Sequence, residues 1–310
     1  MLRLISLFLK YFTVTMLFAF YSSGANDFSC WAGGNFIGVQ GGSANVYVNM
    51  TPTIGVGQNL VVDLSSQIKC YNQDSGATVD YAKLASGSAF AGALVNFQGT
   101  IYYNGSTYPF PTTGPTNNFA LNTGNYVPLP AKLYLTPLGG ASGVVIKAGS
   151  LIASFNMIQS NQVRNPLGPI NEAADYVWNV YANNDVVIPT GGCDVSARNV
   201  VVNLPDYPGT AQVPLTVHCA QNQALAYYLT GPTTDSASTI FTNSASSPAQ
   251  GIGVQLSNSG GVIATNNNVA LGTVGTSPVD LGLTATYARS TGQVTAGNVT
   301  AVVGVTFLYP

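Results

Sequence analysis

Segments that alternate apolar and polar residues recur along the whole chain. A period of two is the pattern of strands with one buried face, and clusters of Gly, Pro, Asn and Ser between the segments are typical of turns. No segment keeps helical periodicity over more than about two turns. The expected strands are residues 45–50, 59–70, 144–157, 176–188, 199–206, 214–220, 225–231, 251–256, 279–288 and 301–309. The sequence therefore predicts an all-β protein of two β-sandwich domains.

Length and charge limit the classes of function. A chain of 310 residues suits one large domain or two of about 150 residues. Only 6% of the residues are charged and the net charge is -2, so the chain has no basic face that would attract phosphate. We therefore expect no nucleic-acid partner.

The first residues form a targeting segment. Arg3 and Lys10 precede the apolar run 11–21, and small residues follow it, which is the pattern of a secretory signal peptide. A membrane anchor is the alternative, but the run is short unless Lys10 is buried. Small residues favour cleavage after Ala25, and cleavage after Asp27 would place an acid next to the cut. We assign residues 1–27 to the signal peptide.

All four cysteines lie in the exported part of the chain. An even number of cysteines in a secreted protein indicates disulfides, and nearest-neighbour pairing gives Cys30–Cys70 and Cys193–Cys219. The single histidine, His218, and the absence of a CxxC pair argue against a zinc site. We expect His218 to be structural, and we expect no metal and no cofactor.

A domain boundary is expected at PTGGC, residues 189–193. Proline ends a strand-like run there, two glycines loosen the backbone, and the second disulfide pair begins. The predicted domains are 28–188 and 193–310, joined by a linker at 189–192.

Several segments resemble the FimH family of two-domain tip adhesins of chaperone–usher pili. The resemblance covers nearly all of the exported chain. The segments that carry it include GGSANVYVN (41–49), YPFPTT (108–113), IKAGSLIA (146–153), PTGGCDVSAR (189–198), LPDYPG (204–209) and VTAGNV (294–299). The resemblance implies an N-terminal lectin domain and a C-terminal immunoglobulin-like pilin domain that lacks its last strand. It also implies a non-enzymatic protein at the fimbrial tip on the cell surface.

The resemblance further implies partners in assembly. A periplasmic chaperone would supply the missing strand first, and the N-terminal extension of the adjacent pilus tip subunit would then replace it. The outer-membrane usher is a further expected partner. Gly297 and the penultimate Tyr309 match the terminal strand that the chaperone recognises.

The loop CYNQDSGATVDY, residues 70–81, is either a plain polar turn or part of a sugar site. In the mannose-binding relatives, the matching loop binds one hexose of a host cell-surface glycan. The residues that the resemblance assigns to the sugar site are Phe28, Asn72, Gln73, Asp80, Gln159 and Asn161. The plainer readings are that Asp80 caps a turn and that Gln159 and Asn161 face solvent from a strand.

The chain departs from the mannose-binding pattern around this site. Gln73 stands where the family has an aspartate, and Asp74 and Val163 stand where it has two gating tyrosines. The loop 162–175 is longer than expected and carries Arg164, which could reach a substituent on another sugar. Mannose is therefore the leading ligand, with galactose or N-acetylgalactosamine as the alternative.

Two other classes of function were compared with a lectin. A glycoside hydrolase needs two carboxylates across the scissile bond, and Asp74 and Asp80 would be the candidate pair, but nothing in the sequence indicates an acid in an apolar pocket. A structural tip subunit without sugar binding is the other alternative. Glycan binding separates the lectin from the structural subunit, and hydrolysis of a chromogenic glycoside separates it from the enzyme.

Overall fold

The computed structural model describes residues 28–32, 35–37, 41–138 and 143–309. The predicted signal segment 1–27 and its cut site lie outside these residues. The regular elements are β-strands, apart from two short 3-10 turns, η1 (Leu64–Ser66) and η2 (Gly92–Leu94). The all-β prediction is thus confirmed. Within the described ranges, no helix is long and apolar enough to cross a membrane.

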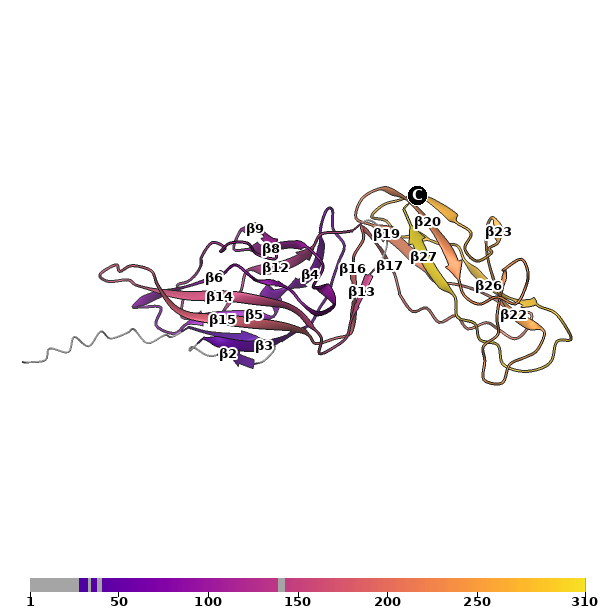
Figure 1. Cartoon of the computed structure of the whole chain (residues 1–310), viewed down its shortest axis with the longest axis horizontal. Helices are drawn as coiled ribbons and strands as arrows, with labels where there is room; N and C mark the ends of the chain where they lie inside the picture. The colour runs from indigo at the N-terminus through magenta and orange to yellow at the C-terminus, as the bar shows by residue number, and fades with distance from the viewer. Residues whose placement is uncertain (1–27, 33–34, 38–40, 139–142, 310) are drawn as a thin grey trace, which may run out of the picture.

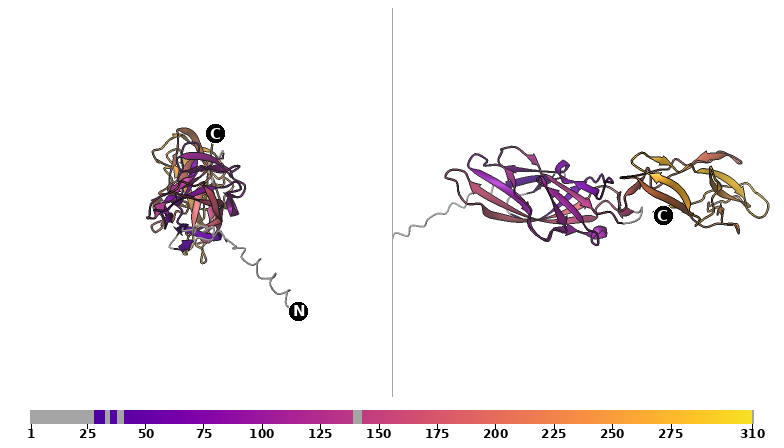
Figure 2. Two further views of the ribbon diagram at one scale, coloured as in Figure 1. Left: turned by 90° about the vertical axis from the view of Figure 1, so that its left-hand side faces the viewer. Right: turned by 90° about the horizontal axis from the view of Figure 1, so that it is seen from above.

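The strands form two bodies that lie end to end along one long axis (Figures 1 and 2). The buried apolar side chains gather in one cluster from Phe28 to Ile188 and in a second from Cys193 to Phe307. We call the two bodies the N-terminal part (28–188) and the C-terminal part (193–309). Each has its own core because alternating strands turn one row of apolar side chains inward.

The largest sheet of the N-terminal part has the order β10-β6-β14-β15-β3, with β7 beside β14. The other sheets are β11-β5-β1-β2, β4-β12-β8-β9 and β13-β16. The bounds are β1 Phe28–Ala32, β2 Asn35–Ile37, β3 Gly42–Val48, β4 Asn59–Asp63, β5 Ile68–Asn72, β6 Thr78–Leu84, β7 Ala89–Phe90, β8 Gly99–Tyr103, β9 Ser106–Phe110, β10 Phe119–Leu121, β11 Val127–Pro128, β12 Ala131–Leu135, β13 Gly143–Ile146, β14 Leu151–Val163, β15 Asn171–Ala182 and β16 Val186–Pro189. The loop between β14 and β15 lies at the end farthest from the C-terminal part (Figure 1).

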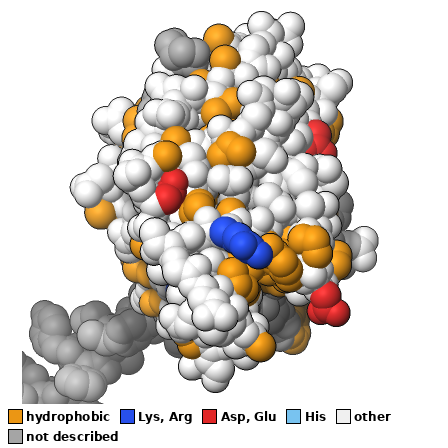
Figure 3. Space-filling view, turned by 90° about the vertical axis from the view of Figure 1, so that its right-hand side faces the viewer, with side chains coloured by type: hydrophobic (Ala, Val, Ile, Leu, Met, Phe, Trp, Pro, Cys, Tyr) orange, Lys and Arg blue, Asp and Glu red, His pale blue; other side chains and the backbone are white. Residues whose placement is uncertain are grey.

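The C-terminal part contains the sheets β17-β19-β25, β18-β26-β22-β21 with β23 beside β22, and β24-β20-β27. The bounds are β17 Cys193–Val195, β18 Thr210–Gln212, β19 Thr216–Cys219, β20 Gln223–Thr230, β21 Ile240–Phe241, β22 Ile252–Asn258, β23 Gly261–Val262, β24 Val269–Val274, β25 Val279–Asp280, β26 Thr284–Arg289 and β27 Gly304–Leu308. The outer end of this part shows few charged side chains (Figure 3).

Five of the expected strands differ from the structure. Four runs are each divided between two strands: 59–70 into β4 and β5, 144–157 into β13 and β14, 176–188 into β15 and β16, and 279–288 into β25 and β26. The run 59–70 is divided between β4 and β5 because Asp63 accepts a hydrogen bond of 3.0 Å from the Ser65 backbone N–H and so caps the turn η1. The run 199–206 is not a strand, although it alternates, because none of the described strands pairs with it.

The structure contains both disulfides that nearest-neighbour pairing predicts. Cys30 lies opposite Cys70 on neighbouring strands, and Cys193 lies opposite Cys219 in the same way. Each disulfide therefore joins two strands within one part, and neither crosses the predicted linker.

Side chains from both parts hold the segment that joins them. The buried Asn59 side chain donates from Nδ2 to the carbonyls of Pro189 at 2.9 Å and Gly191 at 2.7 Å. From the other side, the Gly192 backbone N–H donates to the Tyr309 hydroxyl at 3.1 Å. The joining segment is thus hydrogen-bonded to β4 of one part and to the residue after β27 of the other.

Candidate functional site

Four of the residues predicted for the sugar site are buried together where β1, β5, β6 and β14 meet. Phe28 lies opposite Asn72 in the register of β1 and β5, and Asp80 lies opposite Asn161 in the register of β6 and β14. The exposed fractions of Phe28, Asn72 and Gln159 are 0%, and that of Asp80 is 2%. A carboxylate and two amides at such depth form an unusually polar corner of an apolar core.

Hydrogen bonds connect this corner only in part. Gln159 donates from Nε2 to Asp80 Oδ1 at 3.0 Å, and Asn72 donates from Nδ2 to the Leu121 carbonyl at 3.1 Å and the Thr78 carbonyl at 3.2 Å. The opposite amide oxygens, Asn72 Oδ1 and Gln159 Oε1, are buried and have no hydrogen-bond partner among the described residues. Buried acceptors without donors are costly, so this corner is suited to a ligand rich in hydroxyl groups.

The loop between β5 and β6 combines the two readings that its sequence allows. Asn72 and Asp80, at its ends, point into the buried corner, whereas Gln73 and Asp74 are exposed. The Asp74 carbonyl accepts hydrogen bonds from the backbone N–H groups of Ala77 at 3.0 Å and Thr78 at 2.9 Å. The middle of the loop is therefore a solvent-facing turn. Gln73 is exposed on this turn, whereas the neighbouring site residue Asn72 is buried.

The rim of the buried corner is polar and has no aromatic gate at the two expected positions. Asn161 is half-buried, Asp74 is exposed and Val163 is 45% exposed. Arg164 donates from Nε to the Thr78 carbonyl at 3.0 Å and from Nη2 to the Asn122 carbonyl at 3.2 Å. Two donors of its guanidinium thus hold neighbouring loops together.

Glu172 lies on the opposite face of the sheet from Asp80. It forms an ion pair of 3.0 Å with Lys83, and strand alternation turns Lys83 outward where Asp80 turns inward. Glu172 is therefore a surface residue, with an exposed side chain, and it does not belong to the buried corner.

Sequence reasoning missed Tyr176 as a neighbour of the site. Its ring centroid lies 5.7 Å from that of Phe28, and its side chain is 2% exposed. The signal was present, because Tyr176 and Trp178 occupy the inward-facing positions of β15. That alternation indicates burial but does not indicate which buried ring contacts Phe28.

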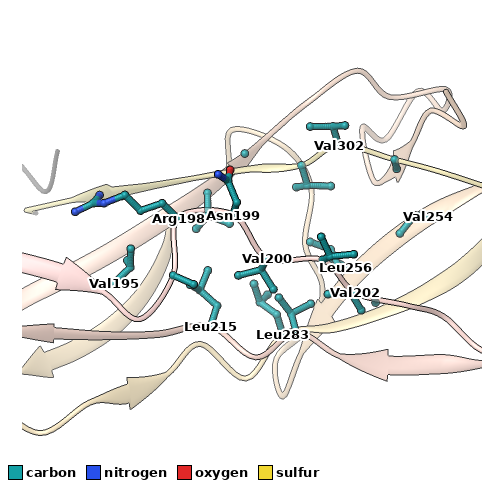
Figure 4. A pocket seen from close by; sticks show the side chains of 18 of the residues that line it. Val195, Arg198, Asn199, Val200, Val202, Leu215, Val254, Leu256, Leu283 and Val302 are labelled. Carbon is teal, nitrogen blue, oxygen red and sulfur yellow. The ribbon is translucent and has the colours of Figure 1, made fainter. Parts of the chain in front are cut away.

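A second candidate site is an apolar groove of about 910 Å³ in the C-terminal part. Val200 and Val202 line it together with Leu283 (Figure 4). Its lining also includes Val195, Leu204, Leu215, Leu256, Val303, Val305 and Phe307. Many of these side chains belong to or pack against the C-terminal core, so the groove opens directly onto that core.

The segments 199–204 and 299–303 line the groove and pair with no described strand. Their side chains nevertheless alternate as in strands: Val200 and Val202 are half-buried, whereas Val201 is 82% exposed. Unpaired segments with a strand-like pattern beside an open core are edges that a further strand can cover.

Both residues predicted for chaperone contact lie near the ends of this region. A Cβ on Gly297 would lie 2.5 Å from the Ala249 backbone nitrogen, so the close backbone approach requires glycine. Tyr309 packs against the C-terminal core, and its hydroxyl accepts the hydrogen bond from Gly192. Tyr309 therefore reaches the joining segment as well as the core.

The molecule thus combines a buried acid–amide corner in one β-rich part with a groove that opens onto the core of the next. The family model described as "FimH, mannose binding" matches residues 30–179. The chain is 55% identical to the type 1 fimbrin D-mannose specific adhesin of Escherichia coli strain K12, over 100% of both chains. This chain belongs to the FimH family of fimbrial adhesins, which are not enzymes, so the hydrolase alternative is set aside.

Other relatives and solved structures were also found. The S-fimbrial protein subunit SfaH of Escherichia coli O6:K15:H31 is 40% identical over 86% of this chain and 92% of its own length. The CsuC–CsuE chaperone–tip subunit complex of Acinetobacter baumannii matches 90% of this chain and 100% of that one, at 11% identity and a TM-score of 0.28. The CupB6 tip adhesin of Pseudomonas aeruginosa matches 85% and 95%, at 12% identity and a TM-score of 0.27. These two TM-scores are too low to carry an argument.

Proposed function

We propose that the chain binds a terminal D-mannose of host cell-surface glycans in the buried corner of the N-terminal part. The observation that carries this proposal is the pair of buried amide oxygens, Asn72 Oδ1 and Gln159 Oε1, without donors among the described residues beside the carboxylate of Asp80. The D-mannose specificity of the relative that is 55% identical over the full chain supports the same ligand.

Each group of the corner has a role in this proposal. Hydroxyl groups of the sugar donate to the two amide oxygens and to Asp80, and Gln159 Nε2 fixes the orientation of that carboxylate through its bond of 3.0 Å. Asn161 binds from the rim, opposite Asp80 in register. The backbone nitrogen of Phe28, at the start of the exported chain, contributes a further donor, and Gln73 acts from the exposed turn.

The residues at the rim are also compatible with a different terminal sugar. With Asp74 and Val163 at the gate positions and an exposed Gln73, the mouth of the site differs from the mannose-binding pattern. The same architecture with galactose or N-acetylgalactosamine specificity is therefore the second candidate, and a structural tip subunit is the third.

The open groove supports a role in assembly. A strand from the periplasmic chaperone covers it first, and a strand from the adjacent tip subunit replaces that strand after the usher is reached. Residues 28–188 act as the receptor-binding domain, 189–192 as the linker and 193–310 as the pilin domain. The subunit then stands at the fimbrial tip.

A glycan array with the full chain tests the ligand. We expect the strongest binding to glycans that end in mannose. Binding only to galactosides or N-acetylgalactosaminides would replace the mannose assignment by the second candidate, and binding to no glycan would favour the structural subunit.

A further inference from the structure

Four aromatic rings gather on the outward face of the sheet β11-β5-β1-β2. They are Trp31, Phe36, Tyr71 and Tyr126, and we call them the aromatic ledge. Trp31 and Phe36 have centroids 5.8 Å apart in an edge-to-face arrangement, and Tyr71 and Tyr126 are stacked at 5.0 Å. The Trp31 indole N–H donates to the Tyr126 hydroxyl at 2.8 Å and joins the two pairs.

The ledge is exposed although its rings are held in place. Trp31 is 42% exposed, Phe36 is 55% exposed and Tyr126 is 40% exposed, whereas Trp178 lies in the core at 1%. Contiguous apolar surface on a soluble protein commonly marks a binding site, and aromatic rings with polar tips are enriched in such sites. Because the rings fix one another, a ligand would not have to order them.

The ledge lies on the outer face of the same two strands that carry part of the buried corner. Tyr71 immediately precedes Asn72, and in the register of β1 and β5 the pair Ser29–Tyr71 follows the pair Phe28–Asn72. The same two strands therefore turn corner residues inward and ledge residues outward. Trp31 is three positions from Phe28 on β1, which corresponds to about 10 Å along the strand. Because the two side chains lie on opposite faces, a glycan that leaves the corner has to pass around the Phe28 end of β1, and it needs at least two further sugar rings to reach Trp31.

The chemistry of the ledge selects a neutral ligand with flat apolar faces. In the strands β1, β2, β5 and β11, as described, Lys69 is the one charged side chain, and it lies opposite Trp31. A pyranose ring presents C–H groups on its face and hydroxyls on its edge, which match an aromatic face bordered by tyrosine hydroxyls.

We propose that the aromatic ledge is an outer subsite that stacks a neutral pyranose unit of the glycan whose terminal hexose occupies the buried corner. This inference rests on the proposed function, because the corner must hold the end of the same glycan. It gives the site an aromatic contact on the strand beside the corner, at a place separate from the gate positions Asp74 and Val163.

Calorimetric titration of the full chain, with a donor-strand peptide in the groove of its C-terminal part, tests the ledge with methyl α-mannoside and with a linear mannotriose. In Trp31→Ala we expect affinity for the monosaccharide within about twofold of wild type and affinity for mannotriose about threefold to tenfold weaker. Tyr47→Ala is the matched control, because Tyr47 is 40% exposed and stacked on Tyr181 at 5.2 Å in another sheet. This control should change neither affinity.

Fluorescence gives a second measurement. Because Trp178 is buried and Trp31 is exposed, mannotriose should shift the tryptophan emission of wild type, and the monosaccharide should shift it far less. If Trp31→Ala loses the same affinity for both sugars, or loses affinity for neither, the outer subsite is wrong while the proposed mannose site stands. If wild type does not bind methyl α-mannoside, the proposed function itself fails, and the outer subsite fails with it.

Discussion

Asp80 and Asp74 belong to one loop and have opposite environments. Asp80 is 2% exposed and receives a hydrogen bond from Gln159, whereas Asp74 is an exposed residue of the turn. Charged acceptors form the stronger hydrogen bonds, most of all where water is excluded. We therefore expect the buried Asp80 to contribute more to sugar binding than the exposed Asp74, although both are aspartates.

Replacing Asp80 by asparagine should weaken binding of methyl α-mannoside about tenfold to a hundredfold, which corresponds to about 1.5–3 kcal/mol. The change keeps the size of the side chain and removes the charge that accepts from Gln159 Nε2. Isothermal titration calorimetry of the full chain measures the loss. Asp74→Asn makes the same chemical change at an exposed position and should bind as wild type does; equal effects of the two substitutions would contradict the assignment.

Individual elements show what the sequence could and could not predict. Alternation predicted about half of the described strands, because burial of one face determines which residues a strand contains. It gave no boundary inside a long run, so several runs hold two strands. It failed for 199–206, since a strand also requires a partner and none of the described strands lies beside that segment. The hydrogen bond from Gln159 to Asp80 could not be predicted from the sequence either, because it depends on the register of β14 against β6. The sequence did identify both residues, through the family resemblance.

The open groove predicts that the C-terminal part is unstable by itself. Residues 193–310 produced without a chaperone should aggregate, because the groove of about 910 Å³ leaves the core open to water. A synthetic donor-strand peptide should make the fragment soluble and raise its melting temperature, as any ligand of the folded state does. Circular dichroism and size-exclusion chromatography measure both effects. A soluble monomer that unfolds cooperatively without peptide would show that the groove needs no further strand.

The turn before β21 should give the C-terminal part a stability that depends on pH. Burial alone would raise the pKa of Asp235, but hydrogen bonds from the Ile240 and Thr239 backbone N–H groups and the Thr239 hydroxyl outweigh it and hold the pKa below its usual value. A lowered pKa stabilises the fold above the unfolded-state pKa of about 4, and this contribution is lost as the pH falls through the folded-state pKa.

Asp235→Asn should therefore lower the free energy of unfolding at pH 7 and have a smaller effect near pH 3. Urea titration of the full chain with its groove filled by the donor peptide measures both values. A destabilisation that is the same at the two pH values would show that the charge of Asp235 does not contribute.

At the scale of the whole molecule, the two candidate sites lie in different parts of an elongated chain. The proposed sugar site is near the end of the N-terminal part that points away from the joining segment (Figure 1), and the groove lies in the C-terminal part. The hydrogen bonds of Asn59 and Tyr309 to the joining segment are side-chain contacts through which one part can influence the other.

We expect isolated residues 28–188 to bind methyl α-mannoside more tightly than the strand-complemented full chain. The resemblance to FimH-type adhesins motivates this expectation, since contact with the pilin domain holds the lectin domain of that family in a weaker-binding form. Titration of both proteins under one condition measures the ratio of dissociation constants. Equal constants would mean that the two parts of this chain are not coupled.

The short joining segment also determines how the molecule carries load. A pull between a surface-bound glycan and the fibre passes along the long axis, through two stiff bodies in series with the segment 189–192. The Asn59 and Tyr309 hydrogen bonds act in parallel with the backbone there, so they break before the segment extends. Four residues span at most about 14 Å when fully extended. The first length step of a single stretched molecule should therefore stay below that value, and a longer first step would mean that strands of one of the bodies had already unravelled.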